Sequence, residues 1–378
     1  MNTRHLFNLW GPTSLAVLLA ASLSGPTYAQ SLGEQQNADG SAEVSDIAVV
    51  AAEQVEDHRE LPRGHFRLPE NGDIVGEYYT ITVEDQEETL IDIARRHNIG
   101  FEEIRMANPD VSLWVPGKGT DVVIPTRYIL PPAPREGVVI NLSELRLYYY
   151  PADNPGIVET YPVSVGRDGF ATPVGITRTT IKVKDPAWAP PASMRREAAA
   201  RGEPAPAIVP PGPDNPLGRH AILLDMPSYL IHGTNRPDGV GMRASRGCIR
   251  MYPEDIESLY ERLPSGTKVN LMDAPFKAGW ADDGTLFVQT FPQLEENIDD
   301  SEPLQDALAR LNDLVQDQVD VSEEQVKHAI ENPDGRFIAL YGPQAPEEEP
   351  EQTPLKLEGL LEEVEVEVST AVRIDGEA

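Results

Sequence analysis

The sequence predicts an α+β protein of more than one domain. A small β-α-α-β unit precedes a mainly β domain, and a partly helical extension follows. The length of 378 residues exceeds what a single hydrophobic core usually supports. Apolar residues alternate as in strands through the middle of the chain, and they follow helical spacing near residues 90 and 305.

The first 29 residues have the pattern of a secretory signal peptide. Arg4 and His5 precede an apolar run over residues 15–23, and small residues lead to Ala29. The run is shorter than the roughly 20 residues that a membrane-spanning helix needs, although an uncleaved anchor is the alternative. We therefore expect a soluble exported protein with no membrane span after cleavage.

The charge and composition of the chain limit its partners. A formal net charge of −31 argues against binding nucleic acid or anionic lipid through bulk electrostatics. Residues 30–76 are acidic and polar, which predicts a linker with little structure. Residues 344–378 are rich in Glu and Pro and predict a disordered tail.

Residues 77–127 predict the β-α-α-β unit. A strand is expected over residues 78–83, followed by a helix over residues 89–97. A second helix around Phe101 should stop at Asn108, because the residue before a proline is disfavoured in helical geometry. A strand over residues 121–125 closes the unit.

This unit resembles a LysM domain, a module that implies binding to N-acetylglucosamine polymers, here the glycan strands of peptidoglycan. The matching positions are Tyr78 or Tyr79, Thr89, Leu90, Ile93, Ala94, Asn108, Ile124 and Pro125. The family's usual Gly-Asp before Thr-Leu is replaced by Glu87 and Glu88, which puts the first loop in doubt as a sugar contact. A small spacer that no longer binds glycan is the alternative.

Residues 136–273 predict a mainly β domain. Strands are expected over residues 138–142, 145–150 and 159–165, separated by turn residues, which is typical of a sandwich or barrel. A short helix is expected near residues 196–200. The proline-rich loop over residues 204–216 is long enough to suggest a lid, a binding edge or disorder.

Residues 274–343 predict the C-terminal extension. A strand is expected over residues 285–288, and an amphipathic helix follows with leucines spaced along one face. Ser322 and Gln325 resemble a capping box for a further helix that ends at Asn332. The extension either packs on the rest of the protein or binds a partner.

The single cysteine, Cys248, and His232, sixteen residues before it, form the candidate reactive pair. A lone thiol in an exported protein has no intramolecular disulfide partner, and it becomes a nucleophile when a base or positive charge favours the thiolate. An inert buried pair is the alternative. Zinc binding by His220, His232 and Cys248 lacks paired ligand spacing, so no metal is expected.

The segment around Cys248 is basic in an acidic chain. Arg236, Arg243, Arg246 and Arg250 stand against a single acid, Asp238. Arginine binds carboxylates in a bidentate manner, so this charge suits a substrate that carries carboxylates. Salt bridges to the acidic surface are the alternative for two of the four.

Further residues in this segment suit a reactive site. Gly247 permits close approach of the backbone, and N–H groups near it are candidates for an oxyanion hole. Ser245 is a candidate for orienting the loop or the histidine.

With these residues the chain resembles the L,D-transpeptidases with a YkuD-like catalytic domain, and most closely the LysM-bearing ErfK/YbiS-like periplasmic group. The matching motif consists of His232, Gly233, Thr234, Ser245, Gly247, Cys248, Ile249, Arg250 and Met251. Arg246 departs from the pattern, since histidine is frequent at that position. His232 is therefore left as the only histidine of the motif.

The resemblance implies a β-sandwich domain that performs a two-step acyl transfer without a cofactor. Cys248 would be the nucleophile and His232 the general base and acid. Ser245, Gly247, Gly233 and Arg250 would support the loop, and Arg243, Arg246 and Thr234 would contact the substrate.

The implied donor is the tetrapeptide stem of peptidoglycan, cleaved between diaminopimelate and D-Ala in the periplasm. The acceptor is a diaminopimelate amine or a lysine of an outer-membrane lipoprotein. Transfer to water by an amidohydrolase or carboxypeptidase, or a non-catalytic peptidoglycan-binding wall protein, are the alternatives.

Overall fold

The computed structural model describes residues 61–294, 303–316 and 319–344. The predicted signal peptide, residues 30–60 of the predicted linker and residues 345–378 of the predicted tail lie outside the described residues. The described helices are α1 (Leu90–Arg96), α2 (Phe101–Ala107), α3 (Ala192–Ala200), η2 (Pro237–Gly239), α4 (Pro253–Arg262), α5 (Pro303–Val315) and α6 (Glu323–Glu331).

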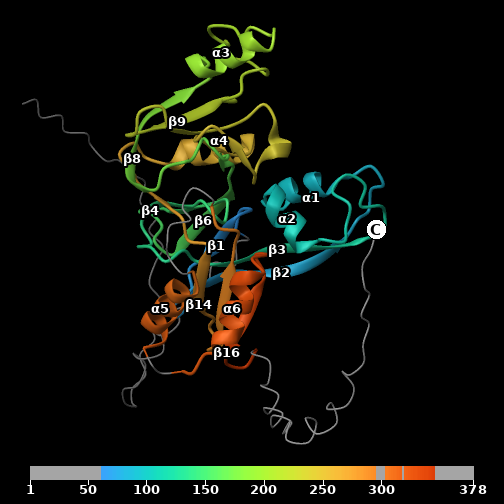
Figure 1. Ribbon diagram of the computed structural model, residues 1–378, viewed down its shortest axis with the longest axis vertical. Coiled ribbons are helices and arrows are strands. Elements are labelled where there is room, and N and C mark those ends of the chain that lie inside the picture. Colours follow the sequence, from blue (N-terminus) through green and yellow to red (C-terminus); the bar gives the residue numbers. More distant parts are fainter. Residues whose placement is uncertain (1–60, 295–302, 317–318, 345–378) are drawn as a thin grey trace, which may run out of the picture. The chain divides into compact units, whose positions relative to one another are not determined.

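The described strands form four sheets. They are β1 (His65–Arg67), β2 (Ile74–Thr82), β3 (Asp121–Ile129), β4 (Gly137–Asn141), β5 (Arg146–Tyr150), β6 (Ile157–Pro162), β7 (Val165–Gly166), β8 (Gly175–Lys184), β9 (His220–Leu224), β10 (Leu230–His232), β11 (Arg243–Ser245), β12 (Ile249–Arg250), β13 (Lys268–Met272), β14 (Phe276–Trp280), β15 (Leu286–Thr290) and β16 (Phe337–Tyr341). The chain is a mixed α+β protein, and most of its middle part is β structure (Figure 1).

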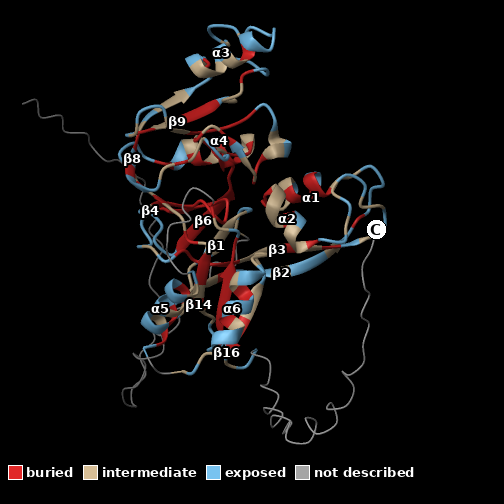
Figure 2. Cartoon of the chain, in the orientation of Figure 1, coloured by how far each residue is buried: buried red, intermediate tan, exposed pale blue. Residues whose placement is uncertain are grey.

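The central sheet has nine strands in the order β1-β6-β5-β4-β13-β8-β9-β10-β12. Its middle strands are buried on both faces (Figure 2). Ile140 and Leu147 enter one hydrophobic core, whereas Val139 and Tyr148 enter a second core on the other face. Covering both faces explains why these strands are almost uniformly apolar instead of alternating with polar residues.

The prediction of a linker with little structure over residues 30–76 is wrong for its C-terminal end, because β1 and the start of β2 lie there. β1 pairs antiparallel with β6, and the ring of Phe66 contacts the ring of Tyr128 at 5.9 Å between centroids. A strand of three residues is too short to show a period of two. Its order comes from this pairing and packing, which the local sequence does not reveal.

The β-α-α-β order predicted for the N-terminal part is present, and we call β2, α1, α2 and β3 the N-terminal unit. Thr89 begins α1 in a capping box with Asp92, in which each side chain accepts from the other's backbone N–H. Asn108 ends α2, donates to the carbonyls of Ile104 and Val123, and accepts the N–H of Val123. The Asn108 amide therefore joins α2 to β3.

The C-terminal extension forms its own three-stranded sheet, β14-β15-β16, and α5 and α6 pack against it (Figure 1). One of the two bonds of the predicted capping box of α6 is present, since Ser322 accepts the N–H of Gln325. β14 and β16 are strands that the sequence reasoning missed. The sheet contacts the N-terminal unit through Ile129 of β3, which clusters with Phe287 and Ala339. Of the two predicted alternatives, the extension therefore packs on the rest of the protein.

A buried ion pair joins this sheet to the central one. Lys277 of β14 donates to the carboxylate of Glu144 and to the carbonyl of Ile129, both at 2.6 Å. Tyr148 donates to the same carboxylate at 2.6 Å. Burial lowers the pKa of the Lys277 ammonium, and the carboxylate opposes that effect. The charge of Lys277 is tolerated in the interior because Glu144 compensates it.

We expect Glu144→Gln to destabilise the protein by about 3–5 kcal/mol, because it leaves a buried ammonium without its counter-charge. Urea unfolding followed by circular dichroism measures this change. Adding Lys277→Met should recover a large part of the loss, since the uncompensated charge is then gone. A single variant within about 1 kcal/mol of the parent would contradict the prediction.

Candidate active site

Two short parallel strands bring the candidate pair together. His232 ends β10 and Cys248 directly precedes β12, while Ile231 lies opposite Ile249 and His232 lies opposite Arg250. Side chains alternate along a strand, and residues paired across two strands point to the same face. His232, Arg250 and Cys248 therefore project from one face of this edge of the sheet.

His232 is buried, and its Nδ1 lies 2.6 Å from the carbonyl oxygen of Gly233. A carbonyl only accepts, so this bond assigns the proton to Nδ1 and leaves the lone pair on Nε2. Burial first, and then the charge of Arg250, lower the imidazole pKa to about 4. At neutral pH His232 is therefore an uncharged base with Nε2 able to accept a proton.

Cys248 is the free cysteine of the chain and is half-buried. Burial raises the pKa of its thiol, while the backbone N–H of Leu230 and the charge of Arg250 oppose the rise. The thiol donates to the carbonyl of Ser228 at 3.5 Å. The thiol and the imidazole are consequently both neutral at rest and do not form an ion pair.

Hydrogen bonds fix the turn that leads to Cys248. Ser245 donates to the carbonyl of Cys248 at 2.6 Å and accepts the N–H of Gly247 at 3.0 Å. Thr172 donates to the carbonyl of Gly247 at 2.9 Å. Gly247 has a φ of +103°, and a Cβ on it would lie 2.8 Å from the ring of Tyr229. Because the Gly247 N–H bonds to Ser245, it is not available as an oxyanion donor.

The arginines of this segment differ in their surroundings. Arg250 is part-buried, and its Nε is among the buried side-chain atoms of the described residues that have no hydrogen-bond partner. Arg246 pairs with Glu197 of α3 and lies 4.3 Å from the ring centroid of Phe170. Arg243 Nε donates to the carbonyl of Gly166 at 3.4 Å. The charge that acts on both His232 and Cys248 is that of Arg250.

Gly233 and Thr234 shape the turn after His232. The N–H of Gly233 donates to the carbonyl of His220 at 3.1 Å, and a Cβ on Gly233 would lie 3.2 Å from a methyl of Ile256. Thr234 is buried, and its hydroxyl accepts the N–H of Arg236 at 2.9 Å. Both residues hold the backbone of this turn.

No group of three or more His, Cys, Asp or Glu side chains in the described part of the chain is placed to hold a metal ion. None of the helices described is long and apolar enough to cross a membrane.

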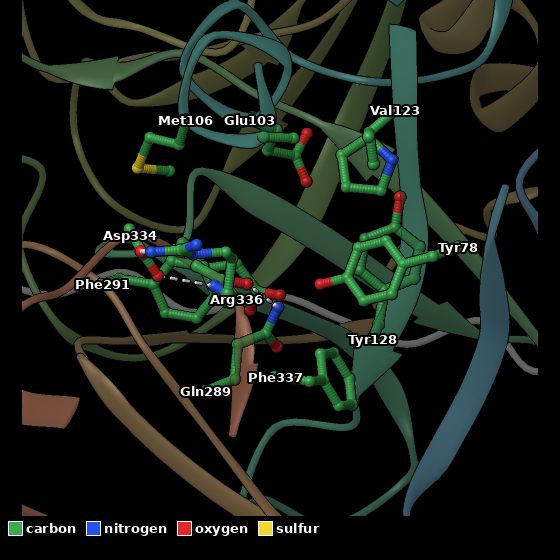
Figure 3. A pocket seen from close by; sticks show the side chains of 14 residues that line it. Tyr78, Glu103, Met106, Val123, Tyr128, Gln289, Phe291, Asp334, Arg336 and Phe337 are labelled. Atoms are coloured by element: carbon green, nitrogen blue, oxygen red, sulfur yellow. Dashed lines mark hydrogen bonds and ion pairs between the residues drawn. The ribbon is translucent and has the colours of Figure 1, made fainter. Parts of the chain in front are cut away.

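A separate cavity of about 370 Å³ lies away from the candidate pair, between the N-terminal unit and the C-terminal sheet. Figure 3 shows Tyr78 and Tyr128 on one side of it and Gln289 and Arg336 on the other. Its lining contains none of the predicted site residues. We assign it no part in the chemistry of Cys248.

The sequence reasoning missed one exposed aromatic residue. Trp114 lies on the loop between α2 and β3 with 61% of its surface exposed, next to the exposed Val115. The loop is held against the start of α1, because the N–H of Leu90 donates to the carbonyl of Leu113. A tryptophan inside a loop of turn-forming residues was the available signal.

The part of the chain that contains His232 and Cys248 is similar to known proteins. The family model of the YkuD L,D-transpeptidase catalytic domain matches residues 135–271, a segment that contains His232 and Cys248. Three relatives come from Escherichia coli strain K12. "Probable L,D-transpeptidase YcfS" is 42% identical over 240 residues, covering 62% of this chain and 75% of the relative.

The other two relatives are similarly close. "Probable L,D-transpeptidase ErfK/SrfK" is 40% identical over 231 residues, covering 61% of this chain and 74% of the relative. "Probable L,D-transpeptidase YbiS" is 37% identical over 281 residues, covering 73% of this chain and 91% of the relative.

The low pKa of His232 predicts a pH dependence of stability. The unfolded imidazole titrates near 6.5 and the folded one near 4, so the unfolded state binds the proton first as the pH falls. The neutral His232 side chain contributes fully to the free energy of unfolding above pH 6.5. This contribution is lost as the pH falls toward 4, and the change is roughly 3 kcal/mol. We expect His232→Asn, whose amide can keep the bond to Gly233, to lose less stability over this range than the parent. Urea unfolding at several pH values measures this difference. If the free energy of unfolding changed equally with pH in the variant and the parent, the prediction would be contradicted.

Proposed function

The chain belongs to the L,D-transpeptidase family, and from this membership we propose that Cys248 is the nucleophile and His232 the general base of its acyl transfer. The observation that carries the proposal is the parallel pairing of β10 with β12. It sets the thiol, the imidazole and the charge of Arg250 on one face. The neutral imidazole supports the assignment, since only an uncharged His232 can accept the thiol proton.

We propose a donor step on the tetrapeptide stem of peptidoglycan. His232 Nε2 takes the thiol proton, and Cys248 Sγ attacks the carbonyl carbon between diaminopimelate and D-Ala. The C–N bond breaks as the imidazolium returns the proton to the leaving amine. The products are a thioester on Cys248 and free D-Ala.

The second step transfers the acyl group to an amine. The acceptor nitrogen attacks the thioester carbonyl, His232 takes its proton, and the C–S bond breaks to restore the thiol. The acceptor is a diaminopimelate side chain, which gives a 3-3 cross-link, or a lysine of an outer-membrane lipoprotein. Transfer to water by the same residues would make the protein an amidohydrolase or carboxypeptidase.

Arg250 is suited to support both steps. Its part-buried guanidinium, whose Nε has no hydrogen-bond partner, would stabilise negative charge on the sulfur or on a substrate carboxylate. Arg243 and Thr234 are proposed substrate contacts. Arg246 is proposed as a further contact, and a stem carboxylate would have to compete there with Glu197.

We further propose that the N-terminal unit is a LysM module that binds glycan strands in the periplasm, and that the curled central sheet is the family's β-sandwich. The β-α-α-β order and the joining role of Asn108 support the first proposal. Trp114 and Val115 supply an exposed apolar surface on which a sugar ring can stack.

Cys248→Ala should abolish acyl transfer and leave glycan binding unchanged, because the thiol and Trp114 lie on different elements. Mass spectrometry of the protein with disaccharide-tetrapeptide and a lysine-bearing acceptor peptide measures the transfer. Sedimentation with insoluble peptidoglycan measures the binding. Equal loss of both activities in the variant would count against the assignment.

The products in that experiment also separate the acceptors. A stem without D-Ala joined to the lysine indicates protein anchoring, and a stem dimer indicates 3-3 cross-linking. Free tripeptide alone indicates hydrolysis. With no product from the parent protein, a non-catalytic peptidoglycan-binding protein becomes the better interpretation.

Trp114→Ala should weaken binding to soluble N-acetylglucosamine oligomers about ten-fold, the equivalent of about 1.4 kcal/mol. The lost stacking surface is the reason, and calorimetric titration is the measurement. Ile208→Ala, which removes a similarly exposed apolar side chain from another loop, is the matched control. Unchanged affinity in Trp114→Ala would remove this loop from the binding surface.

A further inference from the structure

We propose that the N-terminal unit directly positions the active-site segment, because one turn of that unit, residues 99–103, holds the chain on both sides of Cys248. This proposal rests on the function proposed for Cys248. It assigns to Gly100 and Phe101 a positioning role in catalysis that is separate from any binding of glycan.

The turn first holds the chain before Cys248. The N–H of Phe101 donates to the carbonyl of Val240 at 2.9 Å, and the N–H of Glu102 donates to that of Gly241 at 3.2 Å. Gly100 and Gly241 meet backbone to backbone. A Cβ on Gly100 would lie 2.8 Å from the Cα of Gly241, so neither glycine has room for a side chain.

The same turn holds the chain after Cys248. The hydroxyl of Tyr252 donates to the carbonyl of Ile99 at 3.1 Å, and Tyr252 lies four residues beyond the thiol. In α1 of the same unit, Arg95 forms two bonds of 2.8 Å to Glu254. We call residues 240–254 the active-site segment, and it is attached to the N-terminal unit at both of its ends.

The path from the first attachment to the thiol is short. Gly241 leads to β11, which pairs with β7 and ends at Ser245. Ser245 binds the carbonyl of Cys248 and the N–H of Gly247. Ser245 lies four residues after Gly241, so β11 carries a displacement at Gly241 to the turn that orients Cys248.

A buried charge keeps the turn itself in place. Glu103 accepts two bonds, of 2.8 and 2.7 Å, from the fully buried guanidinium of Arg146 in β5, and it also accepts the N–H of Gly100 at 2.7 Å. Moving the turn away from the sheet would leave this charge unpaired, which is strongly unfavourable in the interior. The turn therefore acts as a rigid support.

Gly100→Ala in the full-length protein tests the proposal. Gly100 has a φ of −84°, so alanine adds no backbone strain, and its Cβ must push against Gly241. With a soluble disaccharide-tetrapeptide as donor, no polymer is present to be tethered. We expect kcat to fall roughly 10-fold to 100-fold, because small misplacements of reacting groups cost that much. KM should change much less.

A second readout needs no activity. The pH profile of Cys248 alkylation by iodoacetamide reports the pKa of the thiol, which burial raises in the parent protein. We expect displacement of the turn to reduce the burial of the thiol, so the profile of Gly100→Ala should shift to lower pH. If this shift occurs while even the parent shows no transfer, the positioning role stands and the proposed function fails.

Two controls separate positioning from general damage. Gly156→Ala adds the same methyl where no atom lies within 4 Å. Ile104→Val weakens the core of the N-terminal unit without touching the active-site segment. Both should keep the parent's kcat and alkylation profile at a temperature where all variants are folded. Equal loss of kcat in Ile104→Val would overturn the proposal, as would parent-like behaviour of folded Gly100→Ala.

A further pair of variants covers the case in which Gly100→Ala does not fold. Phe101 is the first residue of α2, where proline is well tolerated. Proline there removes the N–H that bonds to Val240 and places its Cδ against that carbonyl. Phe101→Ala loses the same ring but keeps that N–H. We expect Phe101→Pro to have a kcat several-fold below that of Phe101→Ala, about 3-fold to 10-fold for one lost hydrogen bond. Equal kcat values would overturn the proposal.

Discussion

The guanidinium of Arg146 is fully buried in β5, and a charge in that position is stable only where it is paired and hydrogen-bonded. Glu103 of the N-terminal unit provides the pair, Asn98 and Thr160 accept further bonds, and the ring of Tyr128 lies 4.2 Å from the guanidinium carbon. All of these partners except Thr160 belong to the N-terminal unit. The central sheet therefore cannot keep this charge without keeping the unit in one place.

Burial also determines the chemistry of the candidate pair. It stabilises the neutral forms of Cys248 and His232, so the thiol at rest has little thiolate character. In the oxidising compartment to which the predicted signal peptide would direct the protein, this state would slow oxidation and disulfide exchange, since both proceed through the thiolate. The same state keeps Nε2 of His232 free to accept a proton. In the proposed mechanism the thiolate would form only as Cys248 attacks a carbonyl, with Arg250 as the nearby positive charge.

The sequence predicted elements whose signals are local. The helices α1, α5 and α6 have apolar residues at helical spacing, and Ser322 caps α6 through a contact three residues away. It did not predict β1, β14 or β16, because these short strands gain their order from pairing with distant strands. The roles of Cys248 and His232 stay predictions. Their positions on adjoining parallel strands follow from the fold, whereas their neutral states depend on burial that no motif encodes.

The attachment of the N-terminal unit changes what glycan binding can contribute. A module on a flexible linker raises the local concentration of substrate in every orientation. If the N-terminal unit binds glycan as proposed, its attachment through Arg146 and Glu103 would present that ligand at one distance and one angle to the active-site segment. Only stems that project from the bound strand toward Cys248 would then react. Under these two proposals, rigid attachment would select stems by their geometry, and the unit would support the active site even when no glycan is bound.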